Sequence, residues 1–159
     1  MVIYRSSDSS NLFCRNCQYT QKLPLLREFF WQARAYIEDT DAGGIVYHAN
    51  YLNFMERART ESLRSLGFDK SDIFDADCIF VVHSLQIDYK KPAKLDDKLN
   101  IEAHVLQLKR SSILFRQNIW RETELLSTAT VKIACIDKIE QKPAAIPAAI
   151  HKALSAVTQ

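Results

Sequence analysis

A single change of hydrophobic period limits what this chain can fold into. Between residues 50 and 66 apolar side chains recur at the spacing of one helix face, and Gly67 is placed to end that helix. After residue 77 the period becomes two and stays so through four segments that are typical of half-buried strands: 81–89, 99–105, 113–119 and 125–135. One alternating segment, 29–37, precedes the helix, and Pro147 is placed to begin a short terminal helix that runs to about residue 154. In the segment 81–89 the alternating residues, His83 among them, are expected to face the core, whereas Cys78 is expected in the preceding loop.

This order of one strand, one long helix and four successive strands predicts the fold class. In a doubly wound parallel sheet the helices alternate with the strands, and here they do not. We therefore expect an α+β fold in which an antiparallel five-stranded sheet wraps around one long central helix. One helix covers only part of such a sheet, so we expect a homodimer or homotetramer joined at edge strands or at the open side of the loop before the helix.

The first 28 residues show neither period and are rich in turn-forming serines. They lack the apolar core of a secretory signal. The sequence therefore divides into an N-terminal extension, residues 1–28, which we expect to be flexible, and a domain of residues 29–159.

Composition argues against several kinds of partner. The net charge of +2 is too small to indicate nucleic acid, and no apolar run approaches the roughly 18 to 20 residues that a membrane-spanning helix needs. Four cysteines do not make a disulfide scaffold, so a reducing, cytoplasmic setting is expected. Cys14 and Cys17 form a CxxC pair, which supplies at most two of the four ligands of a structural zinc, and we expect no metal.

The chemistry of the chain concentrates in residues 38–51, which hold two aspartates, a histidine and two of the three glycines. One well-placed carboxylate with charge stabilisation at a carbonyl oxygen can suffice for hydrolysis when the leaving group is good. The start of the following helix offers unsatisfied N–H groups and the positive end of its dipole. On residue preference alone, Asp39 and Asp41 would more often be turn or cap residues.

The segment 35–67 contains the run Tyr36-x-Glu38-Asp39-Thr40-Asp41-Ala42-Gly43-Gly44-Ile45-Val46-Tyr47-His48-x-Asn50-Tyr51, followed by Glu56-Arg57-Ala58-Arg59-Thr60-Glu61. It closely resembles the hotdog-fold acyl-CoA thioesterases of the YbgC type, relatives of 4-hydroxybenzoyl-CoA thioesterase. Weaker matches follow at Phe80-Val81-Val82, Tyr89-x-x-Pro92-Ala93 and Leu95-Asp96-Asp97. The resemblance covers roughly residues 30 to 150 and excludes the extension.

The resemblance implies roles for residues of the loop. The carboxylate of Asp41 is expected to carry the chemistry, as nucleophile on the thioester carbonyl or as base for a water. The amide of His48 is expected to stabilise the carbonyl oxygen, while its imidazole orients substrate or assists proton transfer. Gly43 and Gly44 are expected to let the chain turn closely and bring substrate near the backbone. Gly44 and Tyr47 are expected to contact the substrate, and Asp39 is expected to be structural.

The same resemblance bears on partners. The substrate would be an acyl-CoA, and no cofactor is expected because coenzyme A is part of that substrate. With no glycine-rich phosphate loop in the sequence, surface cations must hold the CoA phosphates, and Lys90 and Lys91 are candidates, with Lys109 and Arg110 also plausible. Kinship also suggests a link to the Tol-Pal envelope system or to phospholipid synthesis.

Two other functions remain open from the sequence. A hotdog acyl-binding or scaffold protein would keep the architecture without turnover, although the intact acidic loop argues against it. A metal-dependent phosphatase using Asp39 and Asp41 is less favoured, because no further ligands follow at an interpretable spacing.

Overall fold

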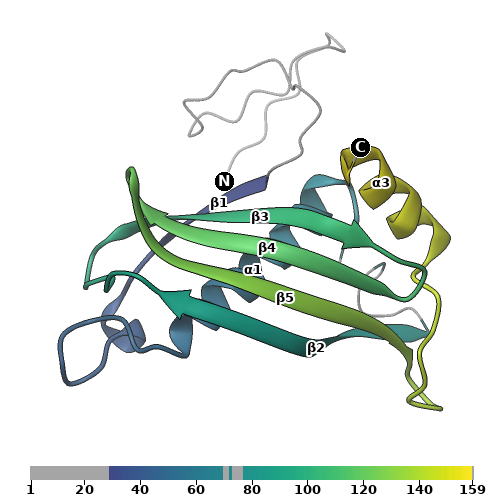
Figure 1. The fold of residues 1–159 in the computed structure, drawn as a ribbon, viewed down its shortest axis with the longest axis horizontal. Coiled ribbons are helices and arrows are strands. Elements are labelled where there is room, and N and C mark those ends of the chain that lie inside the picture. Colours follow the sequence, from purple (N-terminus) through teal and green to yellow (C-terminus); the bar gives the residue numbers. More distant parts are fainter. Residues whose placement is uncertain (1–28, 70–71, 73–76, 159) are drawn as a thin grey trace, which may run out of the picture.

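The computed structural model describes residues 29–69, 72 and 77–158 (Figure 1). The extension, with Cys14 and Cys17, lies outside these residues. The elements of the described chain are, in order, β1 (Phe29–Arg34), the 3-10 helix η1 (Ile37–Asp39), α1 (Asn50–Ser65), β2 (Cys78–Tyr89), β3 (Lys98–Leu108), β4 (Ser112–Arg121), β5 (Glu124–Asp137) and α3 (Ala148–Thr158).

The five strands form one sheet in the order β1-β3-β4-β5-β2, and every neighbouring pair is antiparallel. Figure 1 shows the sheet curving past α1, which lies behind it and crosses the strands obliquely. The predicted α+β arrangement, an antiparallel five-stranded sheet around one long helix, is therefore confirmed. Within the described chain no helix has the length and apolar content to cross a membrane.

The long helix ends where the sequence predicted. Gly67 has a φ of +94°, a conformation that glycine adopts without the steric cost of a Cβ atom. The Gly67 N–H donates to the Arg64 carbonyl at 3.0 Å, and the Phe68 N–H donates to the Leu63 carbonyl at 3.2 Å. These two bonds form a Schellman motif, which satisfies the last carbonyls of α1.

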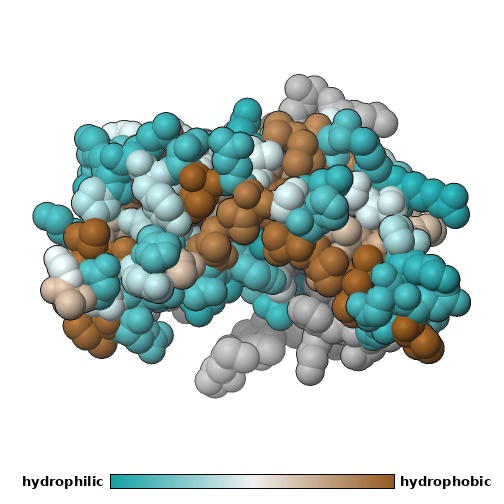
Figure 2. Space-filling view, turned by 60° about the horizontal axis from the view of Figure 1, so that its bottom comes forward, coloured by the Kyte–Doolittle hydropathy of each residue, from teal (hydrophilic) through white to brown (hydrophobic). Residues whose placement is uncertain are grey.

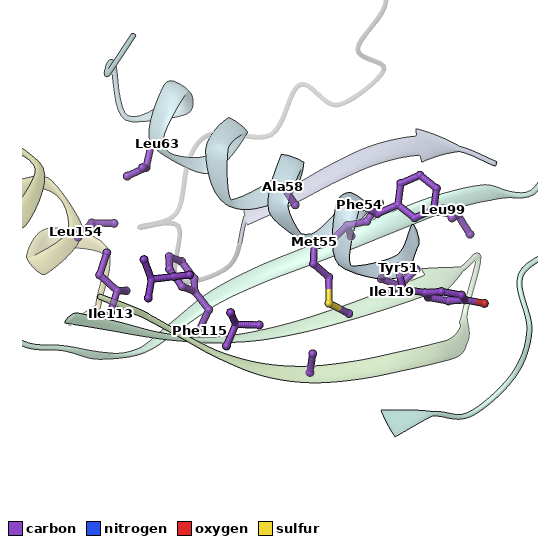
Figure 3. Packing of buried hydrophobic residues seen from close by; sticks show 14 of the residues in the cluster. Tyr51, Phe54, Met55, Ala58, Leu63, Leu99, Ile113, Phe115, Ile119 and Leu154 are labelled. Atoms are coloured by element: carbon purple, nitrogen blue, oxygen red, sulfur yellow. The ribbon is translucent and has the colours of Figure 1, made fainter. Parts of the chain in front are cut away.

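One face of α1 supplies the centre of the core (Figure 3). Its buried apolar side chains meet buried side chains of β3 and β4, such as Leu99, Phe115 and Ile119. The helix packs against β1, β3 and β4, while α3 packs against β3 and adds Ile150 and Leu154 to the core. The sheet face nearest β2 is therefore left largely uncovered by α1.

Two element boundaries differ from the prediction. The first strand ends at Arg34 rather than at residue 37, because the Asp39 carboxylate accepts the Tyr36 N–H at 2.8 Å and folds the chain into η1. The terminal helix runs from Ala148 to Thr158, longer than expected, with the His151 N–H donating to the Pro147 carbonyl at 2.9 Å.

Strand β2 departs most from its predicted environment. Its alternating residues were expected to face the core, but β2 is an edge strand with a bulge between Val82 and Ser84, and His83 is exposed. Val82 is 51% exposed and Leu85 is 42% exposed. Figure 2, which brings this side of the molecule forward, shows a band of hydrophobic surface. Cys78, expected in a loop, begins the strand and is buried.

Candidate active site

The acidic loop between β1 and α1 is anchored by Asp39. Its side chain is buried and accepts hydrogen bonds from the Tyr36 N–H at 2.8 Å and from Asn50 Nδ2 at 3.3 Å. Its backbone carbonyl accepts the Tyr47 N–H at 2.8 Å. One residue thus ties the end of β1, the far side of the loop and the first residue of α1 together, which agrees with the structural role expected for it.

Asp41, in contrast, is exposed at the tip of this loop. Its N–H donates to the Ile45 carbonyl at 2.9 Å, and its carbonyl accepts the Gly44 N–H at 3.0 Å. One carboxylate oxygen, Oδ1, accepts the Gly43 N–H at 2.7 Å. No hydrogen bond to the other oxygen, Oδ2, is present among the described residues. The carboxylate is therefore oriented by its own loop and keeps one oxygen for another molecule.

The two glycines have different roles in holding that carboxylate. Gly44 has a φ of +74°, so the turn itself requires a residue without a Cβ atom. A Cβ on Gly43 would stand 3.0 Å from Asp41 Oδ1, a contact tight enough to displace the carboxylate by a few tenths of an ångström. The predicted close turn at these glycines is thus explained by backbone conformation at one position and by proximity to the carboxylate at the other.

The start of α1 leaves backbone donors without partners. Its N-cap residue, Ala49, has helical backbone angles and no side-chain cap, and the first turn carries no acidic residue. For the N–H groups of His48 and Ala49, the described chain supplies no hydrogen-bond acceptor. Two donors and the positive end of the helix dipole are therefore available where the sequence predicted carbonyl stabilisation.

Two tyrosines support the backbone at this helix start. The Tyr89 hydroxyl donates to the His48 carbonyl at 2.9 Å, and the Tyr89 ring packs edge-on against Tyr51 with centroids 5.3 Å apart. The Tyr51 hydroxyl accepts the Ala93 N–H at 2.8 Å. Burial raises the pKa of both phenols above the ordinary value, so they act as neutral hydrogen-bonding groups.

The exposed rings of Tyr47 and His48 contact each other with centroids 4.3 Å apart. They belong to the same loop as Asp41, which is closed by the hydrogen bonds of Asp39 and Asp41 described above. The predicted catalytic residues Asp41 and His48 and the predicted substrate contacts Gly44 and Tyr47 are thus gathered in one exposed loop.

The two predicted phosphate-binding lysines follow Tyr89 and differ from each other. The N–H groups of Lys90 and Lys91 both donate to the Leu126 carbonyl, at 2.8 and 3.1 Å. The Lys91 ammonium pairs with Glu124, which also pairs with Arg121. Lys90 has no ion pair within the part of the chain that the structure describes. Lys90 is therefore the better placed of the two to receive an anionic ligand.

Sequence reasoning did not single out a pocket beside α1. A cavity of about 400 Å³ lies between α1 and strands β2, β4 and β5, with mainly apolar walls. Arg59 and Glu56 line it, and Asp41 does not. The available signal was Gln117, a polar residue at a core-facing position of β4 that is completely buried. Across residues 29–69, 72 and 77–158, no three His, Cys, Asp or Glu side chains are grouped as metal ligands.

Comparisons with known proteins agree with this arrangement. A family model described as "Thioesterase superfamily" matches residues 43–128. The chain is 50% identical over 126 residues to the acyl-CoA thioesterase YbgC of Haemophilus influenzae, a match that covers 79% of this chain and 93% of that protein.

Two solved structures extend the likeness to three dimensions. A probable thioesterase from Bartonella henselae is 39% identical with a TM-score of 0.68, covering 76% of this chain and 99% of that one. The DHNA-CoA thioesterase from Staphylococcus aureus is 27% identical with a TM-score of 0.77, covering 82% and 90%.

The fold, the acidic loop before the helix and these matches define a thioester hydrolase of the hotdog class. The chain belongs to the thioesterase superfamily, in the YbgC-type group of acyl-CoA thioesterases.

Proposed function

We propose that this protein hydrolyses an acyl-CoA to a carboxylic acid and free CoA, with Asp41 as the catalytic carboxylate. The observation that carries the proposal is the Asp41 side chain, which is exposed and oriented through Oδ1 by the Gly43 N–H at 2.7 Å. The likeness to acyl-CoA thioesterases of the YbgC type supports the choice of substrate.

Two routes are open to this carboxylate. As a nucleophile, Oδ2 of Asp41 attacks the thioester carbon, the C–S bond breaks, CoA leaves as thiolate, and water hydrolyses the resulting anhydride. As a general base, Oδ2 accepts a proton from the water that attacks the same carbon; the C–S bond then breaks, and CoA leaves as thiolate and takes up the proton. A single turnover in ¹⁸O-labelled water tests the nucleophilic route. Label in the Asp41 carboxylate would identify that route, because only hydrolysis of the anhydride can place it there.

Charge on the carbonyl oxygen would be stabilised at the start of α1. The N–H groups of His48 and Ala49, which have no acceptor among the described residues, and the positive end of the helix dipole support this role, because fixed donors stabilise a developing oxyanion without reorganising. The His48 imidazole, exposed beside Tyr47, would orient the substrate or assist proton transfer. Gly44 and Tyr47 would contact the substrate at this loop.

The CoA phosphates would lie near the end of β2. Lys90 supports this placement best, because Lys91 is already paired with Glu124. A cationic side chain on a flexible stem suits a phosphate as a point charge. No cofactor besides the substrate's own CoA is needed, and a cytoplasmic location follows from the proposed substrate. A link to Tol-Pal or phospholipid synthesis has only family resemblance in its support.

A second copy of the chain would complete the site. Hydrolytic active sites exclude bulk water, and Asp41 and His48 are both exposed in the single chain. The bare edge β2 carries no Lys, Arg, Asp, Glu or Pro from Cys78 to Ile87, so nothing on it opposes strand pairing. We propose a homodimer joined along β2, in which the pocket beside α1 receives the acyl group; a homotetramer built from such dimers remains compatible.

A substrate panel tests the function and its main rival. Thiol release is measured with short, long and aromatic acyl-CoAs, in the presence and absence of a chelator. We expect turnover of at least one class and no effect of chelation. Binding of acyl-CoAs without thiol release across the whole panel would identify an acyl-binding or scaffold protein instead.

A further inference from the structure

The pocket beside α1 has mainly apolar walls, and its polar lining residues are Glu56, Arg59 and Thr60. Leu63, Phe80, Phe115 and Ile133 supply hydrocarbon walls from four different elements. Among these walls the Arg59 side chain is only 11% exposed. Burial lowers the pKa of this guanidinium, and the charge of Glu56 partly offsets the effect. A charged, nearly buried guanidinium therefore forms part of a pocket wall that is otherwise mainly apolar.

The guanidinium is held in one direction but few of its donors are used. One terminal nitrogen of Arg59 donates to Gln117 Oε1 at 2.5 Å, and Gln117 Nε2 donates to the Met55 carbonyl at 2.9 Å. Because Gln117 is fully buried, this chain of bonds fixes the side chain in place.

The charge of Arg59 is only weakly neutralised. The nearest carboxylate oxygen, on Glu56, lies 3.9 Å from the other terminal nitrogen, which is beyond hydrogen-bond distance, and the Glu56 side chain is 57% exposed. A guanidinium carries five N–H donors. In the described chain only the bond to Gln117 engages them, so donors remain that a molecule in the pocket can meet.

We propose that Arg59 is a specificity-determining residue that recognises an oxygen acceptor on the acyl chain of the substrate. The favoured acyl group then combines a hydrocarbon portion, which contacts the apolar walls, with a hydroxyl, carbonyl or carboxylate oxygen that accepts from the guanidinium. This inference rests on the proposed function, in which this pocket receives the acyl group. A site built to hydrogen-bond an oxygen discriminates against the chain that lacks it, because its donors are then left unpaired.

The test uses matched acyl-CoA pairs of equal chain length, with and without one oxygen at successive chain positions. The oxygen is a hydroxyl, a ketone or a terminal carboxylate, which separates neutral from anionic acceptors. We expect at least one oxygenated member to exceed its plain partner in kcat/KM by about tenfold or more. In Arg59→Met that ratio should fall by about the same factor, whereas Arg57→Met, an exposed change on the same helix, should keep it.

Binding to the Asp41→Asn variant gives a second readout that does not require turnover. The same preference for the oxygenated member should appear in the dissociation constants. The inference is overturned if the wild-type protein shows a ratio near one between oxygenated and plain members for every pair in both readouts. It is also overturned if the preference survives in Arg59→Met. Absence of hydrolysis across all pairs, with the binding preference intact, instead contradicts the proposed function alone.

A double variant keeps the test possible if Arg59→Met does not fold. Arg59→Met leaves Gln117 Oε1 unpaired in the core, which can destabilise the protein. Arg59→Met combined with Gln117→Leu replaces both partners by apolar side chains of similar size. If the single variant does not fold, the double variant is used in its place. We expect it to lose the preference for the oxygenated substrate. Retention of that preference would refute the role of Arg59.

Discussion

The Tyr89 hydroxyl donates a hydrogen bond to the backbone carbonyl of His48 at 2.9 Å. This contact joins the last residue of the edge strand β2 to the loop that precedes α1. It fixes the peptide unit that carries the Ala49 N–H and follows the His48 N–H, and we propose both N–H groups as donors to the thioester carbonyl. Tyr89 is thus a positioning residue, which acts through the backbone rather than on the substrate.

Removing this hydroxyl should slow the chemical step more than it weakens the fold. We expect Tyr89→Phe to lower kcat severalfold with KM nearly unchanged, because the lost bond misaligns donors that matter most in the transition state. The free energy of unfolding should fall by about 1 kcal/mol, which is the usual net contribution of one hydrogen bond. Steady-state kinetics with urea unfolding checks both, and Tyr36→Phe, at a ring that is 57% exposed, is the control. Loss of stability with unchanged kcat would contradict the positioning role.

The two loop glycines should respond differently to alanine. In Gly43→Ala the new Cβ stands 3.0 Å from Asp41 Oδ1, so the carboxylate must shift by a few tenths of an ångström and kcat should fall severalfold, with little change in stability. In Gly44→Ala nothing lies within 4 Å, but the φ of +74° is strained, so stability should fall by about 1 kcal/mol. Kinetics and chemical denaturation of both variants test this contrast, which the reverse pattern would refute.

A charge on the bare edge strand should separate the proposed dimer. Leu85 is 42% exposed on β2, and Leu85→Asp would place two like charges near each other in a paired edge. We expect the dimer dissociation constant to rise about tenfold or more and activity to fall with it. Light scattering after gel filtration measures the mass, with Ile139→Asp as control at a residue that is 92% exposed. A wild-type protein that is monomeric and fully active would reject the shared site.

Cys135 should be unreactive in the folded protein. Burial, reinforced by the neighbouring Cys78 thiol, raises the pKa of Cys135 to about 12 from an ordinary value of 9.0. Since the thiolate is the reactive form, alkylation of Cys135 at pH 8, followed by mass spectrometry, should be negligible until urea unfolds the chain. The raised pKa stabilises the fold fully below pH 9.0 and loses this effect as pH rises toward 12. Rapid labelling of the native protein would contradict this environment.

Much of the fold was predictable because each segment has a clear period. The stripe of α1 and the alternation of β3, β4 and β5 all face one core, so local pattern and burial agree. β2 was misjudged because its alternation is as regular as that of a central strand, and a sequence does not state that a strand lies at an edge. The exposure of His83 follows from that position.

The loop residues were predictable because their types and order are distinctive, and the structure adds how they are held. The separation of an anchoring Asp39 from an exposed Asp41 depends on burial, which the sequence leaves open. The Tyr89 contact to His48 joins residues 41 positions apart, and the Arg59 bond to Gln117 joins residues 58 apart. Such pairs depend on how the sheet curves around the helix, and no local pattern marks them.

The most direct measurement is acyl-CoA hydrolysis by Asp41→Asn beside Asp39→Asn. We expect Asp41→Asn to lose nearly all of kcat, about a thousandfold or more, while its unfolding midpoint stays close to wild type, because the carboxylate is exposed and its amide can still accept from Gly43. Asp39→Asn should instead lower the unfolding midpoint, because that side chain is buried and bonded to Tyr36 and Asn50. Near wild-type turnover by a folded Asp41→Asn variant would contradict the central claim that this carboxylate performs the chemistry.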